Sequence, residues 1–160
     1  MRISIFLFVL LLVSETAFSQ CNIKSTEQGE GYTTYYMDPE LVAQNEDFGI
    51  ALSVQSVDDK YYLALTFRFA GKAQPLEEKV AMELVNGYTL EMGMYTMEVG
   101  SAQGIELCMA VFFIEDEVVP YFKTSDLKAI RFKTQDTKSH VVKVNANPSA
   151  LKRQLKCFLK

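Results

Sequence analysis

The sequence predicts a mainly β protein, an antiparallel β-sandwich or curved sheet with short helical pieces and a C-terminal amphipathic helix. Three observations lead to this fold class. Apolar and polar residues alternate through most of 50–69, with the period of two that is typical of strands. Asn86-Gly87 separates two apolar runs, which is the strongest short-range hairpin signal. Residues 148–159 gather most of their apolar side chains on one arc of a helical wheel.

The first 19 residues have the form of a secretory signal peptide. Arg2 precedes an apolar run over 3–13, and the small residues Ala17 and Ser19 stand at the positions that a signal peptidase requires. The run is too short to cross a bilayer, which takes about 20 apolar residues. We therefore predict cleavage after Ser19 and a mature chain without a transmembrane span. The alternative interpretation is a buried N-terminal helix or strand.

The start of the mature chain reads as an extended N-terminal tail over 20–31, followed by a single β-rich domain over 32–160. The tail is polar and contains glycine, whereas the Tyr-Thr-rich segment 32–37 suits a strand. Asp38-Pro39-Glu40 has the form of a helix start, with Asp38 as the cap and Pro39 at the first helical position. We expect one or two helical turns there.

The middle of the chain predicts two antiparallel hairpins and a central strand. The alternation over 50–69 is interrupted by Asp58-Asp59-Lys60, which places one apolar and one mixed face on a hairpin. The Asn86-Gly87 turn joins strands over 80–85 and 88–94, with a bend near Gly93. Residues 105–114 are almost continuously apolar, a pattern that favours a strand in the middle of a sheet.

The last third of the chain predicts a short helical piece, two more strands and the terminal helix. Their expected ranges are 115–122, 127–133, 140–144 and 148–159. Asn147-Pro148 supplies the cap and the first residue of the terminal helix. Gln154 falls inside the apolar arc of this helix, which should pack on the sheet.

Three cysteines, Cys21, Cys108 and Cys157, leave one unpaired when a single disulfide forms. Export to an oxidising compartment favours pairing. Cys21 lies in the tail and Cys157 at the edge of the apolar helical arc, so we predict a Cys21–Cys157 disulfide with Cys108 as a free thiol. Two alternatives remain: no pairing, or a lipid on Cys21. Gln20 and Phe18 depart from the small residue and the leucine that a lipoprotein signal requires.

Charge is distributed unevenly along the chain. Residues 20–122 hold 5 Lys/Arg and 17 Asp/Glu, a net charge of −12, whereas residues 123–160 hold 10 Lys/Arg and 2 Asp, a net charge of +8. Such asymmetry marks a polyanion-binding or membrane-facing surface in some proteins. The interpretation we favour is that the basic part packs across an acidic sheet and offsets its charge internally, without nucleic-acid binding.

Catalytic and metal-binding patterns are sparse. The single histidine, His140, has no nucleophile motif around it, and cysteine spacings typical of zinc sites do not occur. The acidic turns at 58–59 and 115–117 lack the regular spacing of a calcium loop. We predict no catalytic residue, metal or cofactor. Carboxylates that pair in space keep a small hydrolase as an alternative.

Tyrosine and basic side chains are the predicted binding residues. Tyr35 and Tyr62 offer large amphipathic contact area, and alternation places Tyr62 with Arg68 on the face opposite Leu63. The alternative is ordinary cross-strand packing of the tyrosines. The polar arc of the terminal helix adds three weak candidates, which are Lys152, Arg153 and Lys156. A solvated outer face is the alternative for that arc.

The segments ELVNGYTLEM and FFIEDEVVPYFKTSDLKAIRFK together resemble small uncharacterised secreted bacterial β-sheet proteins. The resemblance implies the fold class and export, but no activity or site residue. The sequence therefore predicts a secreted or periplasmic, non-enzymatic binding protein with a protein or polymer partner. Its alternative is an envelope-attached protein, held by a lipid on Cys21 or by the basic helix at an anionic surface.

Overall fold

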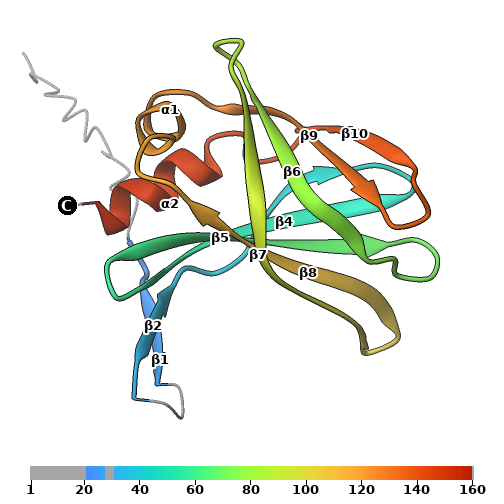
Figure 1. The fold of residues 1–160 in the computed structure, drawn as a ribbon, viewed down its shortest axis with the longest axis horizontal. Helices are drawn as coiled ribbons and strands as arrows, with labels where there is room; N and C mark the ends of the chain where they lie inside the picture. Colours follow the sequence, from blue (N-terminus) through green and yellow to red (C-terminus); the bar gives the residue numbers. More distant parts are fainter. Residues whose placement is uncertain (1–20, 28–30, 160) are drawn as a thin grey trace, which may run out of the picture.

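The computed structural model describes residues 21–27 and 31–159, so the predicted signal peptide lies outside the described residues. The described chain is mainly β, as predicted, with ten strands and two short helices (Figure 1). The strands are β1 (Lys24–Glu27), β2 (Thr33–Tyr36), β3 (Glu40–Gln44), β4 (Phe48–Val57), β5 (Lys60–Phe69), β6 (Leu76–Leu84), β7 (Thr89–Ala102), β8 (Ile105–Ile114), β9 (Leu127–Thr134) and β10 (Ser139–Lys143). The helices are α1 (Val119–Thr124) and α2 (Ala150–Phe158).

All ten strands belong to one antiparallel sheet, with the order β1-β2-β4-β5-β8-β7-β6-β9-β10 and with β3 on the edge of β4. Both predicted hairpins are present, as β4–β5 and β6–β7. The prediction of a central strand over 105–114 is also confirmed, because β8 lies between β5 and β7. The bend expected near Gly93 is the point where β7 leaves β6 and pairs with β8.

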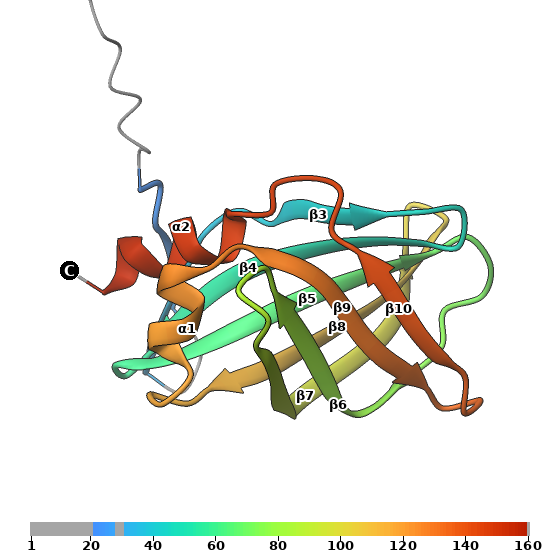
Figure 2. The same cartoon turned by 90° about the horizontal axis from the view of Figure 1, so that it is seen from above.

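The sheet curves until the chain after β10 meets β3, which gives a sandwich-like interior within a single sheet. The backbone N–H groups of Asn145 and Ala146 both donate to the Val42 carbonyl, at 3.1 Å, and so connect the chain after β10 to β3. The side chain of Asn145 also exchanges two hydrogen bonds with the backbone of Gln44, at 2.7 and 3.0 Å. Figure 2 shows α1 and α2 side by side at one end of this curved sheet.

Aromatic rings fill the interior between the two halves of the sheet. Phe132 of β9 lies 4.7 Å from Phe67 of β5 and 5.3 Å from Phe48 of β4, measured between ring centroids. Phe67 is fully buried, as are Phe112 of β8 and Phe122 of α1. These contacts join residues far apart in the sequence, so the core forms only when both hairpins and the β9–β10 pair come together.

The turn between β6 and β7 contains the predicted Asn86-Gly87, and three residues, 85–87, lie inside the hydrogen bond from the Leu84 N–H to the Tyr88 carbonyl at 2.8 Å. Gly87 lies at φ 94°, and its N–H donates to the Leu84 carbonyl at 3.0 Å. This is a turn followed by a left-handed residue, a common three-residue hairpin loop. A Cβ added at Gly87 would meet no atom within 4 Å, so the cost of a substitution there is conformational rather than steric.

Gly87→Ala will therefore destabilise the protein by about 1–2 kcal/mol, the cost of holding a side-chain-bearing residue in the left-handed region. The matched control is Gly93→Ala, because Gly93 lies in β7 at a negative φ with nothing within 4 Å of an added Cβ. Urea unfolding of the two variants measures the difference. Equal midpoints for both would contradict the assigned turn.

The helix expected at Asp38-Pro39-Glu40 is wrong, because this segment leads into strand β3. Val42 and Ala43 are both fully buried, next to a bulge in the β3–β4 register between Leu41 and Ala43. Burial of these neighbours outweighs the local helix-start signal, since tertiary packing overrides propensity. Part of the predicted tail is also a strand, because β1 pairs with β2.

The terminal helix expected over 148–159 is α2, which begins two residues later. Asn147, the expected cap, has a φ of 41°, and its side-chain amide donates to the Leu41 carbonyl at 2.9 Å. A tertiary contact thus replaces the capping bond, and Ser149 stands at the N-cap without a side-chain capping bond, its hydroxyl accepting from Arg153 at 3.1 Å instead. The helical piece expected over 115–122 is α1, and the piece begins and ends later than predicted.

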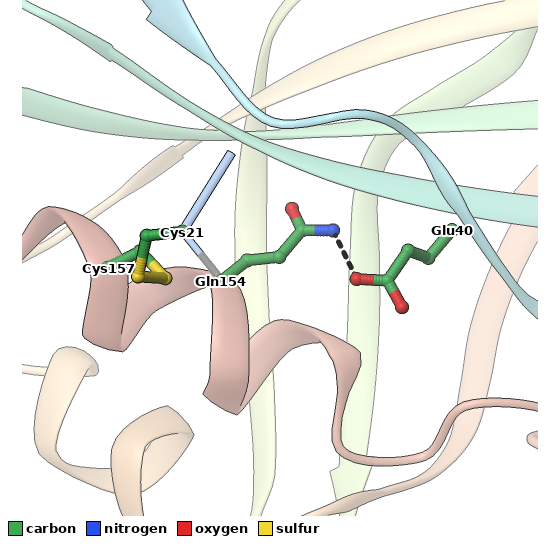
Figure 3. The surroundings of a disulfide bond; sticks show 4 residues. All are labelled: Cys21, Glu40, Gln154 and Cys157. Atoms are coloured by element: carbon green, nitrogen blue, oxygen red, sulfur yellow. Dashed lines mark hydrogen bonds between the residues drawn. A yellow bond between two sulfur atoms is a disulfide. The ribbon is translucent and has the colours of Figure 1, made fainter. Parts of the chain in front are cut away.

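The predicted disulfide is present between Cys21 and Cys157, across 136 residues of chain. Cys108 is free and fully buried in β8, where burial raises the pKa of its thiol and keeps it protonated. One turn before Cys157, the buried Gln154 accepts a hydrogen bond from the Val54 N–H at 2.8 Å and donates to Glu40 Oε1 at 2.9 Å (Figure 3). Helix α2 is thus joined to the chain before β1, to β3 and to β4.

Candidate functional site

The central strands carry apolar side chains on both of their faces. On β8, Cys108, Ala110 and Phe112 point into the core and are fully buried. The alternate residues Met109 and Phe113 point outward and are 43% and 38% exposed. A strand that is apolar on both sides is typically covered on both sides. Among the described residues, the elements in extensive contact with β8 are its sheet neighbours β5 and β7.

Neighbouring strands extend this outward apolar surface. Tyr62 of β5 pairs with Phe113 across the ladder, with ring centroids 5.7 Å apart. Tyr95 of β7 lies 5.3 Å from Tyr62, and it is 69% exposed because it sits in the register shift between Met94 and Thr96. We call the five outward residues of this cluster the outer sheet face. They are Tyr62, Tyr95, Met109, Val111 and Phe113.

A hollow of about 560 Å³ adjoins the outer sheet face. Its lining combines tyrosine rings, uncharged polar groups and one charge of each sign, and includes Tyr32, Thr34, Gln55, Asp58, Lys60, Tyr62 and Tyr95. Burial, followed by the neighbouring Tyr95 and Asp58, raises the pKa of Tyr62. Tyr62 therefore remains a neutral phenol at physiological pH and presents a ring and a hydroxyl donor to whatever occupies the hollow.

The predicted tyrosine and arginine candidates do not form one site. Tyr62 and Arg68 share the outward side of β5, but Ala64 and Thr66 separate them, and Arg68 lies beside Gly49 and Leu107 at the far end of the strand. Tyr35 is exposed on β2, where alternation directs it away from the side of Thr34 that lines the hollow. Of these three candidates, Tyr62 alone belongs to the outer sheet face.

The basic candidates on α2 are largely engaged in ion pairs. Lys152 contacts Asp126 at 2.5 Å, and Arg153 pairs with Glu40 of β3, whereas Lys156 is exposed. Two further pairs join the basic β9 to the acidic β6, Arg131 with Glu83 and Lys133 with Glu77. Contacts between the acidic and basic parts thus offset charge inside the fold, as the favoured interpretation expects.

Sequence reasoning missed four of the five residues of the outer sheet face. The sequence signal was present in residues 105–114, whose apolar residues occupy both alternating sets. We interpreted this run as a central strand and derived no exposed face from it. Tyr95 gave no signal of its own, because its exposure results from a register shift that depends on the pairing of β7 with two different strands.

His140, the single histidine of the sequence, lies in a chain of contacts at the β9–β10 turn. No group of three or more His, Cys, Asp or Glu residues in the described part of the chain could hold a metal ion. His140 stacks on Phe132, and its Nε2 lies 3.2 Å from the Thr134 hydroxyl, which itself donates to Asp136 at 2.6 Å. Thr134 is almost fully buried, so this chain of contacts closes the β9–β10 turn.

Among the described residues, no helix has the length and apolar character needed to cross a membrane. No protein-family model, curated protein or solved structure matches this chain. Among the described residues, the outer sheet face exposes apolar side chains that folding alone does not require. Exposed apolar clusters of this kind mark interaction sites in soluble domains.

Proposed function

We propose that the protein is an exported, non-enzymatic binding module that contacts its partner through the outer sheet face. The observation that carries this proposal is the exposure of Tyr95, Phe113 and Met109 beside the half-buried Tyr62 on the central strands. Aromatic residues and methionine are enriched where proteins contact partners, and charged residues are depleted there. All five members of the face are uncharged.

Export is supported by the N-terminal sequence and by the disulfide. Disulfides persist in oxidising compartments such as the periplasm or the extracellular space. The sulfur of Cys21 is bonded to Cys157, and a sulfur in a disulfide has no free valence for a lipid thioether. We therefore propose that Cys21 carries no lipid. The ion pairs of Lys152 and Arg153 likewise favour a sheet-based interface over a basic-helix contact with an anionic surface.

A capture experiment tests the proposed function. The tagged mature protein is incubated with the exported fraction of the cells that produce it, and bound molecules are quantified by mass spectrometry. We expect a discrete partner, captured at least 10-fold less by a Tyr62→Ser/Phe113→Ser variant, because truncating interface aromatics costs about 2 kcal/mol or more.

The matched control is Val141→Ser, which removes an exposed apolar side chain from β10, away from the outer sheet face. Circular dichroism and a urea midpoint establish that each variant is folded. Undiminished capture by the double variant, or the absence of any partner enriched by the wild type, would contradict the proposal.

A further inference from the structure

Two gaps in the sheet are closed by side-chain amides that take the place of a strand. Asn145 exchanges two hydrogen bonds with the backbone of Gln44 on β3. Gln154 accepts a hydrogen bond from the Val54 N–H of β4. Val54 lies beyond the part of β4 that pairs with β3. Unpaired strand edges are templates for further strands, and native proteins cover them or place charges there. This chain covers the edges at β3 and β4.

Among the described residues, the second half of β7 has no such amide along its edge, and the Leu76 N–H reaches the sulfur of Met97 rather than its backbone, at 3.2 Å. The pairing of β7 with β6 ends at Gly93, and from Met97 to Ala102 its ladder partner among the described residues is β8. Gln103-Gly104 forms a two-residue hairpin turn after Ala102, with both residues at positive φ. The pair next to such a turn, Ala102 with Ile105, is hydrogen-bonded, the next pair is not, and the two kinds alternate along the ladder. The backbone N–H and C=O groups of Val99 and Ser101 therefore point away from β8.

The surface beside this edge contains a hollow that can accept a side chain of an added strand. This hollow of about 230 Å³ lies on the outward side, where Gly100 provides no side chain and where Thr66, Leu107 and Met109 form the walls. Glu98, two residues before Gly100, also lines it and forms no ion pair within the described part of the chain. Met109 also belongs to the outer sheet face, so the hollow and that face are continuous.

We propose that an extended peptide segment of the partner adds to the free edge of β7 as an antiparallel strand. Backbone groups of Val99 and Ser101 supply its hydrogen bonds, as in other cases of strand addition. Alternate side chains of the added strand face outward. The one beside Gly100 is a large apolar residue that fills the hollow, and the one beside Glu98 is Lys or Arg. Antiparallel order places the apolar residue two positions before the basic one.

This inference rests on the proposed function and names the class of partner, a protein segment with an apolar-x-basic pattern. The edge at β1 is a poorer docking edge, because its exposed strand carries both Lys24 and Glu27, and charged side chains discourage edge pairing. On the free part of β7, Glu98 is the one charged residue between Met97 and Ala102. We expect a positive charge on the partner residue beside Glu98, because opposite charges that face each other across two strands attract.

Binding of a fluorescently labelled peptide with blocked ends, Thr-Leu-Thr-Lys-Thr, tests the inference by anisotropy with the full mature chain. We expect saturable binding and slower amide hydrogen exchange at Val99 and Ser101. Glu98→Lys should weaken binding of this peptide about 5-fold, because a favourable cross-strand charge pair becomes a repulsive one. The same variant should prefer Thr-Leu-Thr-Glu-Thr, which the wild type binds more weakly.

Two variants complete the design. Ser101→Pro removes an N–H that points away from β8, at an edge position where proline is tolerated, and should abolish binding. Glu115→Lys makes the same charge change in the turn after β8 and should leave binding unchanged. No saturable binding by the wild type, or no charge reversal in Glu98→Lys, would overturn strand addition. If capture through the outer sheet face succeeds while the peptide fails, this inference alone is lost.

Discussion

Cys21→Ser will lower the free energy of unfolding by about 2–5 kcal/mol, the usual cost of removing a native disulfide. The bond closes a loop with a sequence separation of 136 residues. Long loops gain the most from a cross-link in the chain-entropy account, because the unfolded chain loses more freedom. Removal of the bond also releases the chain before β1 from α2. Urea unfolding of the wild type and the variant measures the difference.

Reductant and thiol counting provide the controls for this prediction. Dithiothreitol should lower the wild-type stability to that of the variant and leave the variant almost unchanged. Under denaturing conditions without reductant, the wild type should titrate one thiol, Cys108, and Cys21→Ser should titrate two. Three thiols in the denatured, exported wild-type protein would show that the disulfide does not form.

Gln154→Ala will destabilise the protein by about 2–3 kcal/mol, near the upper end of the cost of leaving buried polar groups without partners. The Gln154 side chain is fully buried and bonds to three groups: the Val54 N–H, the Asp38 carbonyl and the Glu40 carboxylate. All three lose a partner in the variant. Chemical unfolding measures the loss, and Lys156→Ala, an exposed position on the same helix, should change stability by less than about 0.5 kcal/mol.

Gln154→Glu separates the roles of the amide oxygen and the amide nitrogen. The carboxylate can still accept from the Val54 N–H, but it loses both donated bonds and places a second negative charge near Glu40. We expect a loss at neutral pH at least as large as that of Gln154→Ala. Position 154 is fully buried, and burial disfavours the charged form of a carboxyl, so the loss should shrink as the pH falls and the new side chain becomes protonated. A loss independent of pH would argue against this contact.

The hairpins and the disulfide follow from local patterns in the sequence. Alternation over 50–69 determines which faces of β4 and β5 are apolar, and the Asn86-Gly87 turn connects β6 and β7 as predicted. The disulfide was predicted from the position of Cys157 at the edge of the apolar helical arc, which an N-terminal tail carrying Cys21 can reach when the helix packs on the sheet. These inferences depend on the period of the apolar residues and on the residue types in turns, both of which can be read from a few neighbouring residues.

The parts that sequence reasoning missed depend on contacts between distant segments. Strand β3 replaces a predicted helix because Val42 and Ala43 find buried positions against β4, and Asn145 bonds to the backbone of Val42 and Gln44. No local pattern contains that information. The outer sheet face was missed for a related reason, since the sequence shows that β8 is apolar on both sides but not that its outward side stays uncovered.

Site-specific photo-crosslinking tests the use of the outer sheet face most directly. A photoreactive phenylalanine analogue is placed at position 113 in the protein as the producing cells export it. A second variant carries the analogue at position 141, an exposed apolar position on β10. We expect irradiation to give a discrete higher-mass adduct from position 113 and none from position 141. An adduct at position 141 with none at position 113 would show that the partner binds elsewhere, and would contradict our account.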